Sequence, residues 1–127
     1  MKNRPFRQRI GFALEGWRAG WRRERSFRTQ AATGLCAVAA LLLLRPAPLW
    51  WALVAVAIAL VLALELLNSA VETLADLLHP AIHPEVKALK DMLAGAVLVM
   101  SVAALAVGAA LLVDRLPTVM LWMEEWR

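Results

Sequence analysis

The chain has 127 residues, 61% of them hydrophobic, and it carries a formal net charge of +4. A mean hydropathy of +0.63 excludes an ordinary soluble domain and indicates a single small integral membrane protein. Its basic residues lie beside hydrophobic segments and form no separate basic domain, so we expect anionic lipid headgroups, and no nucleic acid, as partners. The single cysteine, Cys36, excludes an intramolecular disulfide.

Residues 1–25 predict an amphipathic helix that lies in the membrane surface. Apolar side chains recur at helical spacing along one side, while arginines project elsewhere. Because this segment is basic and the first apolar stretch follows it directly, it shows no cleavable signal pattern, and we expect the N-terminus to be retained.

Three segments are predicted to cross the membrane. The first, 28–45, is apolar and ends at an Arg-Pro-Ala-Pro sequence, because proline lacks the backbone donor that a helix needs. The second, 49–78, starts at a pair of tryptophans typical of the membrane interface and continues beyond the membrane as a polar extension. The third, 91–113, is uncharged after its first residue, and Ala104 and Gly108 offer one small-xxx-small step for close helix contact.

Two segments are predicted to lie outside the membrane core. Prolines interrupt residues 79–90, which are expected to form a charged loop or a short helical turn. The tail, residues 114–127, carries two tryptophans one turn apart and is expected to form an interfacial segment. Of the 14 Lys and Arg residues, nine lie between the N-terminus and Arg28, where the first span starts, and two lie in 79–90, so the positive-inside rule places both of these segments in the cytoplasm.

The second span contains the polar stripe on which the functional prediction depends. At about 100° per residue, Glu65, Asn68, Glu72 and Asp76 fall on one face of the helix. A rise of ~1.5 Å per residue from Leu49 places Glu65 about 24 Å along the axis, close to the far boundary of a ~30 Å hydrocarbon core. A carboxylate at that depth has to be paired, bound or protonated. Its position suits a general base for a hydroxyl, and the structural alternative is a protonated side chain that hydrogen-bonds another helix.

The neighbouring polar residues keep both a functional and a structural interpretation. Asn68 is predicted either to serve the site or to hydrogen-bond another helix. Glu72 and Asp76 approach water, where a solvated helix end explains each of them singly. Glu24 lies at the cytoplasmic edge of the first span. Two carboxylates from different helices, such as Glu24 and Glu72, suit Mg²⁺, whose remaining positions are left to phosphate oxygens and water.

Lys90 and Asp91 stand at the start of the third span. Asp is an ordinary helix N-cap, but Lys at a helix N-terminus reinforces an anion site, and the alternative is a lysine that snorkels to the interface. His79 and His83 are separated by a proline and lack an HExxH pattern, so they are treated as loop residues, one of which is a candidate to contact a nucleotide. No GxxxxGK[ST] or GxGxxG motif occurs, so a phosphate site has to be built differently.

Together, Glu24, the ELLNSAVETLAD segment at 65–76 and the LKDMLAGAVL segment at 89–98 resemble the prokaryotic diacylglycerol kinase family, small membrane kinases that include undecaprenol kinases. The pattern E-[IL]-[IL]-N-[ST]-A-[IV]-E, followed by K-D, is long and specific. The resemblance covers nearly the whole chain and weakens in the tail. It implies an all-α homotrimer of three-span subunits in the bacterial cytoplasmic (inner) membrane, each with an amphipathic surface helix. Mg·ATP would phosphorylate a membrane lipid alcohol at the cytoplasmic face.

The resemblance also implies the roles of individual residues. Glu65 matches the catalytic base, and Glu24 and Glu72 match the magnesium ligands. The family's Lys-Asp nucleotide pair matches Lys90 and Asp91. The full set of implied contacts to ATP is Glu24, Glu72, His83, Lys90 and Asp91.

Supporting and substrate-contacting residues follow from the same match. Asn68, the asparagine of the motif, and Asp76 are implied to support the site. The surface-helix motif R-A-x-W-x-x-E-x-x-F-R is also present, and the implied contacts to the lipid substrate are Arg18, Trp21, Phe27, Arg28, Glu65 and Ala94. Pro5 occupies the place of the family's early nucleotide-facing arginine, with Arg4 and Arg7 as the adjacent candidates.

We therefore expect ATP- and magnesium-dependent phosphorylation of diacylglycerol to phosphatidic acid, with undecaprenol as the alternative acceptor. A cation-conducting protein is a competing class, in which the polar stripe would line a pore, but residues 49–64 offer no polar lining for the other half of such a pore. A scaffold protein held together by small-residue packing is a third class, and it leaves the polar stripe unexplained.

Overall fold

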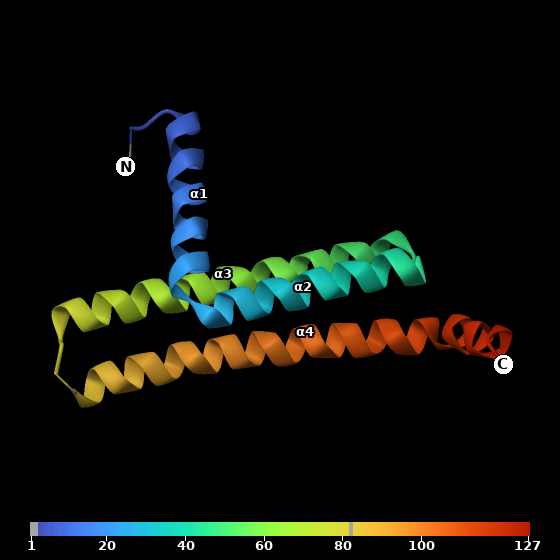
Figure 1. Ribbon diagram of the computed structural model, residues 1–127. Helices are drawn as coiled ribbons and strands as arrows, with labels where there is room; N and C mark the ends of the chain where they lie inside the picture. Colours follow the sequence, from blue (N-terminus) through green and yellow to red (C-terminus); the bar gives the residue numbers. More distant parts are fainter. Residues whose placement is uncertain (1–2, 82) are drawn as a thin grey trace.

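The protein folds into helices joined by short connections. The computed structural model describes residues 3–81 and 83–127, and these form four α-helices (Figure 1). Their bounds are α1 Phe6–Arg23, α2 Arg25–Leu44, α3 Pro48–Leu78 and α4 Pro84–Glu125. The predicted all-helical fold class is confirmed. Residues 1 and 2 of the predicted surface helix and residue 82 of the predicted loop lie outside the described residues.

Helices α2, α3 and α4 run along one another as a bundle (Figure 1). Each is long and apolar enough to cross a membrane, which confirms the three predicted candidate spans. The 20 residues of α2 measure about 30 Å, which is the thickness of a hydrocarbon core. Helices α3 and α4 are longer, with 31 and 42 residues, and both continue past the start of α2 toward their own connection (Figure 1).

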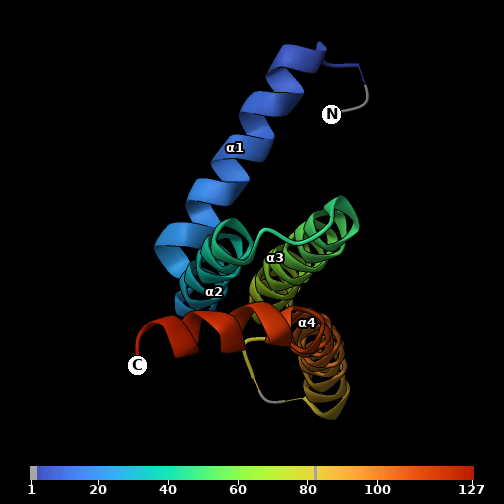
Figure 2. The same cartoon turned by 90° about the vertical axis from the view of Figure 1, so that its right-hand side faces the viewer.

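Helix α1 runs crosswise to this bundle in both views (Figures 1 and 2). The chain turns at Glu24, whose φ of −110° and ψ of 111° end α1 and begin α2. The guanidinium of Arg28 donates to the carbonyl oxygen of Trp21 at 2.8 Å, so it occupies a C-terminal carbonyl of α1 that the helix leaves without a partner. This contact holds the corner between α1 and α2.

The corner also packs closely on α3. Gly20 is buried, and a Cβ atom at its position would come within 2.5 Å of Leu66 Cδ2. Phe27 is 1% exposed and meets Trp17 edge-on, with ring centroids 5.6 Å apart. The C-terminal end of α1 therefore lies at the level of Leu66, one residue beyond the carboxylate that the sequence singles out.

At the opposite end of the bundle, polar contacts join α4 to the α2–α3 connection. Arg115 Nε donates to the carbonyl oxygen of Leu44 at 3.1 Å, and Trp50 Nε1 donates to Asp114 Oδ2 at 3.1 Å. Beside them lies the main apolar cluster of buried residues, formed by Leu41, Leu44, Val54 and Leu111. Asp114 and Arg115 thus have partners on neighbouring elements, and the helix continues through them.

Helix α4 extends beyond the predicted 91–113 span in both directions. It begins at Pro84, inside the predicted 79–90 loop, because proline is well suited to the first helical turn and His83 Nδ1 accepts from the backbone N–H of Glu85 at 3.2 Å. It ends at Glu125, and Pro117 lies within it. The last turns point across the end of the bundle (Figures 1 and 2), which is the bend expected where a proline removes a helical hydrogen bond.

Candidate active site

The centre of the candidate site is Glu65, which is 4% exposed. Among the described residues it is the one charged residue that is buried. Ser26 Oγ donates a hydrogen bond to Glu65 Oε2 at 2.9 Å, from the first turn of α2 to the middle of α3. Because a buried carboxylate without partners is very costly, this contact helps to explain how Glu65 is tolerated at this place. The carboxylate lies at the level where α1 crosses the bundle.

The polar stripe leads from Glu65 toward water. All four of its residues lie in the single helix α3, so the predicted common face is present in the structure. Exposure rises along it: Glu65 is buried, Asn68 and Glu72 are partly buried, and Asp76 is exposed. At ~1.5 Å per residue, the stripe covers about 16 Å from Glu65 to Asp76. It therefore connects a buried carboxylate with a solvated surface.

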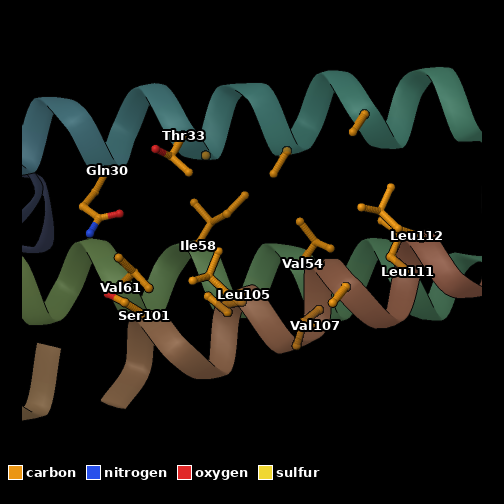
Figure 3. A pocket seen from close by; sticks show the side chains of 17 residues that line it. Gln30, Thr33, Val54, Ile58, Val61, Ser101, Leu105, Val107, Leu111 and Leu112 are labelled. Carbon is orange, nitrogen blue, oxygen red and sulfur yellow. The ribbon is translucent and has the colours of Figure 1, made fainter. Parts of the chain in front are cut away.

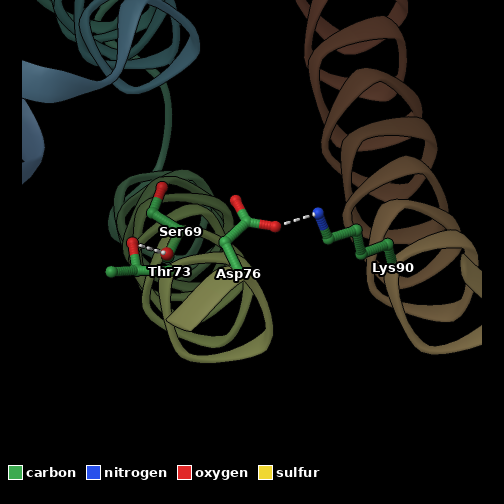
Figure 4. A network of polar contacts seen from close by, with 4 residues as sticks. All are labelled: Ser69, Thr73, Asp76 and Lys90. Carbon is green, nitrogen blue, oxygen red and sulfur yellow. Dashed lines mark hydrogen bonds and ion pairs between the residues drawn. The ribbon is translucent and has the colours of Figure 1, made fainter. Parts of the chain in front are cut away.

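Two ion pairs lie at the water-facing end of the stripe. Lys90 Nζ contacts Asp76 Oδ1 at 2.6 Å and so joins α4 to α3 (Figure 4), and Lys87 Nζ contacts Asp91 Oδ2 at 2.6 Å. Lys90 precedes the uncharged part of α4, and its hydrogen bond to Asp76 raises the pKa of the lysine above its usual value, with a smaller contribution from the charge of Glu72. Lys90 is therefore a permanent positive charge beside two carboxylates of the stripe.

An apolar cavity of about 590 Å³ lies between α2, α3 and α4 (Figure 3). Gln30 and Ser101 lie at one end of it, whereas Leu111 and Leu112 lie at the other (Figure 3). The polar end faces the site, because Gln30 is one helical turn from Ser26 and the lining residue Val61 is one turn from Glu65. The cavity thus begins below the buried carboxylate and extends into the apolar half of the bundle.

The predicted small-xxx-small step on α4 lines this cavity. Both Ala104 and Gly108 belong to its wall, and nothing lies within 4 Å of the place where a Cβ atom of Gly108 would stand. Within the single chain, these small residues therefore leave space open instead of bringing two helices into contact.

Comparison with known proteins gives the family. The sequence profile described as "Prokaryotic diacylglycerol kinase" matches residues 11–112. The chain belongs to the prokaryotic diacylglycerol kinase family. The match confirms the resemblance inferred from the motifs, and it ends before the bend at Pro117, so the tail is outside the matched part.

Two curated relatives of this diacylglycerol kinase family member are themselves named as lipid kinases. A diacylglycerol kinase of Synechocystis sp. is 36% identical over 110 residues, which are 86% of this chain and 63% of that protein. An undecaprenol kinase of Bacillus subtilis is 32% identical over 114 residues, which are 90% of this chain and 92% of that protein. The chain thus spans less than two thirds of the first relative and nearly all of the second.

Within this kinase family, Glu24 and Glu72 are the expected magnesium ligands. Glu24 lies at the α1–α2 corner, two residues from Ser26, and Glu72 lies two turns beyond Glu65 on α3. Among residues 3–81 and 83–127, no group of three or more His, Cys, Asp or Glu side chains could hold a metal ion. A magnesium site here has to take further oxygens from phosphate and water, which is the donor set that Mg²⁺ usually has in kinases. Glu24 and Glu72 are the carboxylates that would supply the protein's share of these oxygens.

The other residues implied by the kinase family are distributed over the same end of the molecule. Phe27 is buried in the corner and Arg28 holds an α1 carbonyl, so both are engaged in packing the surface helix. His83 caps α4. The implied side chains that remain exposed on this surface are Arg18, Trp21, Asp91 and Ala94.

Sequence reasoning missed Ser26. It lies between Glu24 and Phe27 in the surface-helix motif, but no periodic pattern links it to Glu65, which is 39 residues away in the chain. Only the close packing of the α1–α2 corner against α3 brings the two side chains together. A hydroxyl two residues after a corner carboxylate was the sole sequence signal for this contact.

Proposed function

We propose that this protein is an ATP- and magnesium-dependent diacylglycerol kinase that forms phosphatidic acid at the cytoplasmic face of the bacterial inner membrane. The observation that carries the proposal is the place of Glu65. A buried carboxylate lies at the depth of the crosswise helix α1, between an apolar cavity on one side and a charged, solvated helix end on the other. A membrane-dissolved alcohol and a water-soluble nucleotide can meet only at such a boundary.

The cavity suits the hydrocarbon part of a lipid alcohol. Its walls are apolar, and its polar end faces Glu65, so a chain inside it would present its hydroxyl group to the carboxylate. Lipid tails are about as apolar as these walls, so the chain gains little free energy by leaving the bilayer. The contribution of the cavity is placement, because holding reacting groups in position lowers the barrier of the reaction.

Glu65 accepts the proton of the lipid hydroxyl while the oxygen attacks the γ-phosphorus of ATP, and ADP leaves. Glu24 and Glu72 are the residues that would hold Mg²⁺, which neutralises charge on the phosphate oxygens when bound. Lys90 and Asp91 contact the nucleotide. Both now form ion pairs at the surface, and exposed pairs of this kind exchange easily for phosphate or ribose groups.

The choice between two lipid acceptors depends on the relatives. The identity is slightly higher to the diacylglycerol kinase of Synechocystis sp., which supports diacylglycerol. The match covers far more of the undecaprenol kinase of Bacillus subtilis, so undecaprenol is the second candidate. Both are alcohols on hydrocarbon chains, and the same Glu65 would serve either of them.

The proposal includes an orientation and an assembly. The arginine-rich α1 lies on the cytoplasmic surface against anionic lipids, and the end of the stripe and residues 79–90 face the cytoplasm. Three copies form the functional unit, as in the implied family assembly. Chemical cross-linking in native membranes that yields dimers but no trimers would contradict this part.

The decisive experiment is transfer of labelled phosphate from ATP to lipid by the purified protein, with diacylglycerol and undecaprenol tested in parallel. We expect labelled phosphatidic acid as the main product. The variant Glu65→Gln keeps the shape of the side chain but removes the proton acceptor, so we expect turnover to fall by about 10² to 10⁴ with nucleotide binding close to the parent. Turnover of undecaprenol alone would change the substrate, and near-normal turnover in the variant would remove Glu65 as the base.

A further inference from the structure

We propose that Ser26 is a positioning residue that holds the carboxylate of Glu65 in the orientation needed to receive the acceptor proton. This inference depends on the proposed role of Glu65 as the base. It assigns a function to a hydroxyl that belongs neither to the polar stripe nor to the Lys90–Asp91 pair. The contact that carries it is the hydrogen bond of 2.9 Å between Ser26 Oγ and Glu65 Oε2.

The hydrogen bond of Ser26 differs from those of the other helical hydroxyls in the described chain. Thr29, Thr33 and Thr73 each donate to the carbonyl oxygen four residues earlier in their own helix, at 2.8 to 3.1 Å. That local bond is the usual one for such a side chain. Ser26 instead donates across to α3, so its hydroxyl serves another helix.

The local structure explains this difference. Ser26 is the second residue of α2, so the carbonyl four residues before it belongs to Arg22 at the end of α1. The chain turns at Glu24 between the two, and Arg28 Nη1 lies 3.5 Å from the Arg22 carbonyl oxygen. The usual acceptor is therefore occupied and displaced, and the hydroxyl of Ser26 is free to meet Glu65.

The contact gives the two carboxylate oxygens of Glu65 different roles. Oε2 receives the hydrogen bond from Ser26, so the carboxylate is held at one edge. Oε1 is then the oxygen left for an acceptor hydroxyl. The described residues contain no buried side-chain polar atom without a hydrogen-bond partner, so this second oxygen is not sealed away from an incoming group. A fixed Oε1 above the cavity gives the acceptor hydroxyl one defined target.

The test compares four variants in the same phosphate-transfer assay with the full-length protein: Ser26→Ala, Ser26→Thr, Thr29→Ala and Glu65→Gln. Loss of a hydrogen bond to a charged group typically changes an equilibrium or rate constant by about a factor of ten or more. Ser26→Ala should therefore lower kcat at least about tenfold, and KM for ATP should stay within about twofold of the parent value. Ser26→Thr retains a hydroxyl and should restore most of the rate. Thr29→Ala is the matched control, since it removes a hydroxyl from the same helix that does not touch Glu65.

Combining the changes separates positioning from a general loss of stability. In the Glu65→Gln background, Ser26→Ala should have almost no further effect on kcat, because the carboxylate that it orients is already absent. Equal losses of kcat with and without Glu65 would overturn the inference, as would normal turnover of Ser26→Ala. Normal turnover of Glu65→Gln would instead overturn the proposed base itself. The thermal midpoint of each variant, measured alongside, shows whether a lost rate reflects lost folding.

Discussion

Filling the cavity from within tests whether a lipid chain occupies it, and Gly108→Leu is the change best suited to this purpose. Gly108 lies about seven residues beyond Ser101, so the new side chain would enter roughly 10 Å below the polar end of the cavity. Nothing within 4 Å opposes a Cβ atom there, so the leucine meets open space. Leucine also favours a helix over glycine by about 0.8 kcal/mol, and the variant should be at least as stable as the parent.

We expect Gly108→Leu to lower kcat/KM for a long-chain lipid acceptor. A leucine that competes with a bound lipid chain for the same space should weaken binding of that chain by about 1 to 3 kcal/mol, the usual range for overpacking. That range corresponds to a decrease in kcat/KM of roughly 5- to 150-fold for a long-chain diacylglycerol. A short chain ends before the level of Gly108, so its kcat/KM should change by less than about twofold.

The assay measures kcat/KM with dioleoyl and dihexanoyl glycerol for the parent, for Gly108→Leu and for Ala106→Leu. Ala106 is exposed on the same helix and does not line the cavity, so it is the matched control. Equal losses with the two acceptors, or no loss with the long one, would refute a lipid chain in this cavity. A change in the size of the assembly would show that a neighbouring subunit fills it.

Two further predictions concern the metal and the membrane orientation. Glu24→Gln and Glu72→Gln should each raise the magnesium concentration that gives half-maximal turnover, because each removes one negative oxygen ligand, and unchanged magnesium titrations in both would exclude them as ligands. For orientation, single cysteines at Ala47 and Lys87 in a background without the native cysteine should react differently with an impermeant thiol reagent in intact cells. Only position 47 should be labelled, and reaction at position 87 would reverse the topology.

The fold was accessible from sequence because it depends on apolar length and on proline. The pattern predicts 49–78 for a helix that the structure places at Pro48–Leu78, since a proline stands at its first position and His79-Pro80 follows its last. The same reasoning did not predict the length of α4. Asp114 and Arg115 look like the end of a span, but their partners lie on other elements and are invisible in the sequence.

The site was partly accessible for a related reason. Glu65 belongs to a periodic stripe and to a long motif, and both are properties of neighbouring residues in one helix. Its contact with Ser26 depends on a corner between two helices, and the angle of a corner has no periodic signature. The cavity likewise arises from the spacing of three helices. Small residues such as Gly108 indicate only that space is available, not whether a neighbouring helix fills it.

If the two crosswise elements lie in opposite headgroup layers, as the proposed orientation of α1 requires, the distance between them sets one preferred bilayer thickness. Helix α1 meets the bundle at one end of α2, and the turns after Pro117 cross it at the other end, about 30 Å away along the 20 residues of α2. An ordinary span adjusts to a thicker or thinner membrane by tilting. Here a tilt would push one crosswise element into the hydrocarbon and lift the other out of its headgroup layer. The surrounding lipid would then have to stretch or compress to match the protein, which would favour membranes whose hydrophobic thickness already equals the length of α2.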